Sequence, residues 1–167
     1  MHARISRVGA MACLAALSLV GALAGPVAAN TQERFQFNEV VEGEYSCGVI
    51  ETTRIVGRGT ASFAGDGSWI GTSIHLTYDG VFTDPATGRV IRQKGHQNVT
   101  EADGLVTMNG QGFFLRLAGE GVVLHDVGRL VFDPSDGSTQ FATPKVLRID
   151  DPEIDARMDA AVCGMFD

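Results

Sequence analysis

Turn chemistry recurs at short intervals along this 167-residue chain and limits the folds that it can adopt. Glycine, proline, aspartate and asparagine favour chain reversals, because they preset or tolerate the backbone angles of tight turns. The segments between the turns alternate in polarity or carry β-branched and aromatic residues, which predicts an antiparallel meander. The predicted turns are Gly65-Asp66-Gly67-Ser68, Asp84-Pro85-Ala86-Thr87-Gly88, Asp103-Gly104, Asn109-Gly110, Gly119-Glu120-Gly121 and Asp133-Pro134-Ser135-Asp136-Gly137.

The meander is predicted to contain eight strands and to end in one short helix. Asp151 is a good N-cap and Pro152 suits the first helical position, so we expect the helix at about 151–163, with Gly164 ending it. The predicted strands are 35–41, 47–63, 69–83, 89–101, 104–109, 111–118, 121–133 and 138–142.

The predicted fold class is all-β, with the eight-stranded antiparallel meander closing into a barrel beside the C-terminal helix. Closure would remove the free sheet edges that an exported protein otherwise exposes. A two-sheet sandwich is the alternative, because strand count does not distinguish the two architectures.

The N-terminal segment has the three parts of a secretory signal peptide. A start containing two arginines precedes an apolar run over 8–24, and Val27-Ala28-Ala29 is a small-residue cleavage site. The alternative is a membrane anchor, but glycines and a proline near the end of the run argue against it. We therefore expect 1–29 to be a cleaved signal peptide and 30–167 to be one secreted, extracellular domain without a membrane span.

The charge of the mature chain disfavours some partners. The full chain has a formal net charge of −7, and loss of Arg4 and Arg7 with the leader takes it to −9. Such a charge repels phosphate backbones and anionic lipid, so we expect no nucleic-acid or membrane partner.

Cys47 and Cys163 are the two cysteines that remain after cleavage. In an exported protein they are expected to form one disulfide, joining the predicted helix to the start of a strand. The competing interpretation is a metal or catalytic thiol, which would need partners at ligand spacing such as C-x-x-C, and the sequence contains none.

One polar cluster follows from the turn Pro85-Ala86-Thr87-Gly88. If this turn is a four-residue loop, cross-strand partners sum to 173, so His75 faces Asn98. Two imidazoles and an amide on one face could bind a polar group or transfer protons inside a barrel. The alternative is an ordinary solvated sheet face. The candidate cluster is His75, Asp79, Lys94, His96 and Asn98, with Thr77, Ser73 and Arg92 on the same face and Ile70, Ile74, Leu76, Tyr78, Phe82, Ile91 and Val99 on the other.

The candidate lumen is apolar. It consists of Phe113, Phe114, Leu115 and Leu117, followed on the next strand by Val122, Leu124, Leu130 and Phe132. In an eight-stranded barrel such residues either line a ligand cavity or fill a dry core.

Other catalytic and metal-binding patterns are weak. His125 precedes Asp126, but neighbouring strand residues point to opposite faces and do not form a catalytic dyad. A zinc site from His75, His96 and His125 lacks short ligand spacing. Gly57-Arg58-Gly59 lacks the third glycine of a dinucleotide motif, and we expect no metal and no cofactor.

A longer pattern resembles a group of small secreted actinobacterial proteins without assigned function. It comprises Cys47-Gly48, Gly57-Arg58-Gly59, Pro85-Ala86-Thr87-Gly88 and the run from Gly119 to Asp133. More remotely, the succession of strands resembles the allene oxide cyclase and dirigent type of barrel, although no catalytic residue of those families can be matched. The resemblance implies export and the fold and supplies no activity.

Two functional hypotheses follow. The first is an exported binding module for a small apolar molecule or an extracellular protein. The second is a cofactor-free enzyme of isomerase or cyclase type, in which His75, His96 and Asn98 face inward. The direction in which His75 points separates the two hypotheses.

Overall fold

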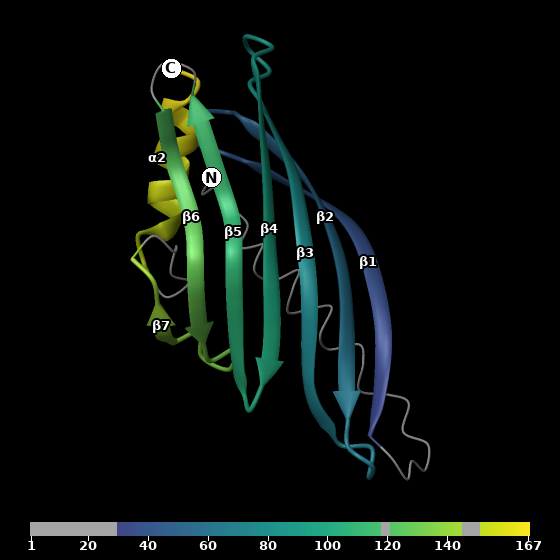
Figure 1. The fold of residues 1–167 in the computed structure, drawn as a ribbon. Helices are drawn as coiled ribbons and strands as arrows, with labels where there is room; N and C mark the ends of the chain where they lie inside the picture. The colour runs from purple at the N-terminus through teal and green to yellow at the C-terminus, as the bar shows by residue number, and fades with distance from the viewer. Residues whose placement is uncertain (1–29, 118–120, 145–150) are drawn as a thin grey trace.

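The computed structural model describes residues 30–117, 121–144 and 151–167, with 113–117 and 121–125 described by backbone alone. It is one antiparallel sheet in which every strand pairs with the next along the chain. Figure 1 shows the curved sheet with the C-terminal helix beside β6. The elements are β1 (Thr31–Glu44), β2 (Ile50–Phe63), β3 (Trp69–Thr83), β4 (Val90–Ala102), β5 (Leu105–Leu117), β6 (Gly121–Phe132), β7 (Thr139–Ala142) and α2 (Ile154–Gly164).

The sheet is open, so the prediction of a closed barrel is wrong, and so is the two-sheet alternative. Strands β1 and β7 are the two edges, and among the described residues they do not pair with each other. The reason lies in their lengths, since β1 has 14 residues and β7 has only 4. A four-residue strand cannot provide the long partner that closure against β1 requires.

The predicted strands 104–109 and 111–118 form one strand, β5, which reduces the count to seven. Asn109-Gly110 is therefore a mid-strand pair. Gly110 has a φ of 138° and lies opposite Gly128, whose φ is 136°. A Cβ at Gly110 would lie 2.4 Å from the carbonyl oxygen of His96, so glycine there allows close approach of β4.

Smaller differences concern the ends of elements. The first strand extends from the predicted 35–41 to Thr31–Glu44, and β2 begins at Ile50, because Cys47 and Gly48 lie in a turn. The helix begins three residues later than predicted, and Asp151 accepts a hydrogen bond from the Glu153 backbone N–H at 3.0 Å.

The predicted register between β3 and β4 is confirmed. His75 pairs with Asn98, and every pair of these two strands has residue numbers that sum to 173. The intervening turn holds this register: the Asp84 backbone N–H donates to the Arg89 carbonyl at 3.0 Å, and the Asp84 carboxylate accepts from the Ala86 N–H at 2.8 Å. The carboxylate also accepts from the Thr87 hydroxyl at 2.5 Å.

The core lies on one side of the sheet, which we call the inner face. Antiparallel partners place their side chains on the same face, so the inner residues form rows across the strands. The principal buried cluster is Ile55, Ile74, Leu76, Val99, Val106, Leu130 and Phe132. Ile70, predicted to belong with the apolar residues, lies near the end of β3 and is 47% exposed.

The Gly57-Arg58-Gly59 segment accommodates aromatic rings from the edge strand. Phe37 pairs with Gly57 and Phe35 with Gly59. A Cβ at Gly57 would lie 2.3 Å from the Phe37 ring, and one at Gly59 would lie 2.4 Å from the Phe35 ring. The two glycines therefore leave room for the rings of Phe35 and Phe37 to pack against the backbone of β2. Aromatic rings that cover glycines in this way compensate for the missing side chains.

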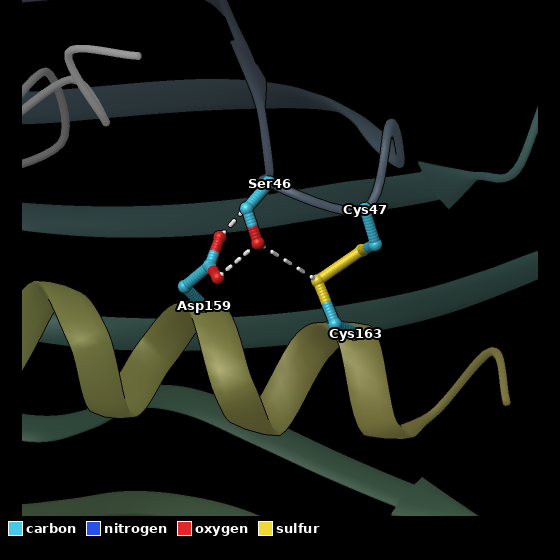
Figure 2. The surroundings of a disulfide bond; sticks show 4 residues. All are labelled: Ser46, Cys47, Asp159 and Cys163. Carbon is cyan, nitrogen blue, oxygen red and sulfur yellow. Dashed lines mark hydrogen bonds between the residues drawn. A yellow bond between two sulfur atoms is a disulfide. The ribbon is translucent and has the colours of Figure 1, made fainter. Parts of the chain in front are cut away.

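The C-terminal segment packs on the inner face through Val162 of α2 and through Met165, the C-cap residue. They belong to a second buried cluster with Tyr45, Val49 and Phe82. The predicted disulfide is confirmed: Cys47 and Cys163 are bonded, with 5.7 Å between their Cα atoms. Beside it, Asp159 accepts hydrogen bonds from the backbone N–H and the hydroxyl of Ser46, at 2.8 and 2.5 Å (Figure 2).

Candidate binding face

The side of the sheet opposite the core, the outer face, carries an uninterrupted row of polar side chains. Six consecutive strands, β1 to β6, each contribute one residue, and the register joins each residue to the next. All six side chains are exposed. This polar row consists of Gln36, Arg58, His75, Asn98, Asn109 and Arg129.

The row spans a distance suited to an extended ligand. Neighbouring strands lie about 4.8 Å apart, so five spacings give a row of about 24 Å. At its centre, His75 Nδ1 lies 2.9 Å from Asn98 Oδ1. The Asn98 oxygen can only accept, so this contact is a hydrogen bond when Nδ1 carries the proton, and it orients the Asn98 amide.

The structure brings the predicted polar cluster together and places it on the exposed outer face. Thr77 pairs with His96, and Asp79 pairs with Lys94. Arg54 of β2 is the other partner of Asp79. The cluster therefore faces solvent, and the inward orientation that the enzyme hypothesis requires is absent for His75 and His96.

Cations are concentrated on this face although the chain as a whole is acidic. Eight Lys and Arg side chains are described, and six of them lie at exposed outer positions of strands: Arg34, Arg54, Arg58, Arg92, Lys94 and Arg129. Many of the acids are in the turns and in α2, including Asp66, Asp84, Asp136, Asp155 and Asp159. The same strands place three exposed acids on this face, Glu42, Glu44 and Asp79, so the described outer side chains keep an excess of positive charge, which favours anionic ligands there.

An exposed aromatic ring lies at the β7 end of this face. Phe141 is 51% exposed, and the Arg129 guanidinium lies 5.8 Å from the centre of its ring. Cation–π contact of this kind restrains the guanidinium while leaving its N–H groups able to donate.

The inner face contains a buried polar group that the sequence did not reveal. Tyr45 donates to Glu51 at 2.7 Å, and Thr53 donates to the other oxygen of Glu51 at 2.6 Å. Burial, with the Glu51 carboxylate as a second cause, raises the pKa of Tyr45, so its hydroxyl remains a donor. Both oxygens of the Glu51 carboxylate accept hydrogen bonds, and Tyr45 packs with Val162 of α2. The group therefore suits a structural role where α2 meets the sheet.

Gln93 completes this inner group. It is 3% exposed, and its Oε1 has no hydrogen-bond partner among the described residues. Its amide lies over Gly80, where a Cβ would come within 2.9 Å of Gln93 Nε2. The absence of a side chain at Gly80 thus makes room for a polar side chain inside the core. Alternation of polarity along β4 could have suggested Gln93 and Gln97 as inner residues.

Several predicted candidates lie outside the described side chains. They are the lumen residues Phe113, Phe114, Leu115, Leu117, Val122 and Leu124, together with His125. Leu130 and Phe132 from the same prediction are buried in the core. Among the residues that the structure describes, no group of three or more His, Cys, Asp or Glu could hold a metal ion. No helix in that part of the chain is long and apolar enough to cross a membrane.

Comparisons with known proteins gave no match: neither a family model, nor a curated protein, nor a solved structure is significantly similar to this chain. The resemblances stated from the sequence stay predictions, and the functional argument depends on the geometry of the outer face.

Proposed function

We propose that this protein is an exported binding module whose outer face binds an acidic extracellular polysaccharide. The observation that carries the proposal is the polar row, in which Arg58 and Arg129 are separated by an imidazole and two amides. Guanidinium groups suit the carboxylates of an acidic sugar, because they offer two parallel N–H donors. Asparagine amides both donate and accept, which suits sugar hydroxyls.

The shape of the face supports an extended polymer. The row crosses six strands of one continuous sheet, and α2 packs against the opposite face. A linear chain could lie along the row and contact each polar side chain in turn. Export, predicted by the leader and supported by the disulfide, would bring the protein to such polymers.

Nucleic acid fits the same face less well. Proteins that hold single strands stack bases on aromatic side chains, and the polar row contains none.

Two hypotheses from the sequence are less compatible with this fold. A small apolar ligand was expected inside a closed lumen, and the sheet is open. A cofactor-free enzyme was expected to direct His75 and His96 into a cavity, and both side chains are exposed.

The test is calorimetric titration of the exported protein with polygalacturonate, with neutral dextran and single-stranded DNA as comparison ligands. We expect binding to the uronate polymer that weakens as salt is raised, because Arg58 and Arg129 pair with its carboxylates. We expect no binding to dextran, which has no carboxylates for the two arginines.

The variant Arg58→Ala/Arg129→Ala should weaken this binding at least tenfold. Arg157→Ala, which removes an exposed cation from α2, is the matched control and should change binding less than twofold. Equal binding to dextran, preferential binding to DNA, or an unaffected double variant would overturn the proposal.

A further inference from the structure

Strand β1 is an edge strand that lacks several of the features with which proteins protect a sheet edge, although it carries charged side chains. It pairs with β2 over all 14 of its residues without a register shift, so no bulge interrupts it. It contains no proline and no lysine. Its other side has no partner among the residues described. Long, regular edges of this kind are templates for a further strand, because their backbone N–H and C=O groups are unpaired on that side.

The residues of β1 are complementary to a second copy of themselves. In an antiparallel pair, opposite residues share a face, and alternate residues of β1 lie on the inner face. The inner faces of two copies are therefore continuous only in registers where the numbers of opposite residues add up to an even value. Of these registers, only those with sums of 76 and 78 place Arg34 opposite an acidic residue. A sum of 78 would also place Glu39 opposite Glu39 of the second copy, and like charges directly opposite are unfavourable.

A sum of 76 has no such conflict. Arg34 then faces Glu42 twice, once on each side of a dyad at Asn38, and Phe35 faces Val41 on the inner side. No two acids are directly opposite in this register. Val40, which is 61% exposed, lies opposite Gln36 and becomes covered.

We propose that two copies of this chain associate through β1, antiparallel and centred on Asn38, to form one continuous sheet of fourteen strands. The pairing is isologous, as closed two-fold symmetry requires, and it leaves no β1 edge free. It brings the outer faces of both copies to the same side. The inference does not depend on the identity of any ligand, since it follows from the edge and its charges alone.

The test is a charge-reversal series on exported, disulfide-bonded protein, measured by sedimentation velocity at physiological ionic strength. We expect a dimer for the unmodified chain at micromolar concentration. Arg34→Glu alone and Glu42→Arg alone each place like charges opposite each other twice, and each should raise the dimer dissociation constant at least tenfold.

The double variant Arg34→Glu/Glu42→Arg restores opposite charges in the same register and should restore the dimer. Arg92→Glu, an exposed cation on β4, is the matched control and should leave the dimer intact. Circular dichroism and the thermal midpoint check that each variant is folded. A monomeric unmodified chain, or a double variant that is no more dimeric than the single variants, would overturn the proposal. Failure of polysaccharide binding would not affect it, because every measurement is made without ligand.

Discussion

Removal of the Cys47–Cys163 disulfide should lower stability strongly while leaving the folded structure almost unchanged. The two residues are separated by 116 positions, so the bond closes a loop that contains most of the mature chain. The chain-entropy relation for such a loop gives about 5 kcal/mol of stabilisation, which acts by restricting the unfolded ensemble. A domain of this size has an unfolding entropy of about 0.3 kcal/mol/K, so the thermal midpoint should fall by about 17 °C.

The folded contacts at this junction do not require the covalent bond. Ser46 and Asp159 stay hydrogen-bonded, and Val162 and Met165 remain in the core. The variant Cys47→Ser/Cys163→Ser should therefore keep its near-ultraviolet circular dichroism at 20 °C, and reduction of the native protein should give the same midpoint as the variant. A fall of less than about 4 °C in both would refute the entropic argument.

The remaining predictions concern β2, the turn at Asp84 and a partly buried carboxyl group. Gly59→Ala should lower the free energy of unfolding by about 1–3 kcal/mol in urea titrations, because its Cβ would meet the Phe35 ring and the Ser73 carbonyl oxygen. Gly43→Ala is the control and should be nearly neutral, since nothing lies within 4 Å of the added atom; an equal effect at both sites would contradict the ring-packing argument. Hydrogen bonds from Thr87 and Ala86 lower the pKa of Asp84, so its stabilising contribution is complete above its unfolded pKa of about 3.8 and is lost as pH falls through the lower folded value. Asp84→Asn should therefore reduce the drop in thermal midpoint between pH 5 and pH 2.5, and an unchanged drop would show that this turn is not acid-sensitive. Burial raises the pKa of Glu101, so Glu101→Gln should stabilise the protein more at pH 7 than at pH 4, as measured by urea unfolding at the two pH values, and the reverse order would contradict its burial.

The sequence predicted local features best where one turn determined them. The Asp84-to-Gly88 turn fixes its own loop length through side-chain and backbone hydrogen bonds, and the β3–β4 register follows from that length. Cysteine number and the signal-peptide pattern were sufficient to predict the disulfide.

Long-range features could not be predicted in the same way. Closure of the sheet depends on how β7 compares with β1, and a four-residue strand carries little sequence signal. The Asn109-Gly110 pair has the composition of a turn, but the close approach of β4 makes it part of a strand.

The candidate site was likewise predictable only where it depends on local structure. Only the His75–Asn98 step of the polar row could be predicted, because it depends on one tight turn. Extending the row to Arg58 and Arg129 requires the registers of three other strand pairs, and bulges shift two of these. The direction of the row, toward solvent or toward the interior, was a property of the tertiary fold.

The position of the disulfide divides the chain topologically. From Cys47 to Cys163 the backbone and the bond form a covalent ring, and β1, ending at Glu44, lies outside it. A single proteolytic cut in any turn within the ring would leave both fragments attached until reduction, whereas a cut between Glu44 and Cys47 would release β1 from everything except its hydrogen bonds and packing. Among the described strands, the one best placed to pair with another molecule is thus also the one that the ring does not retain.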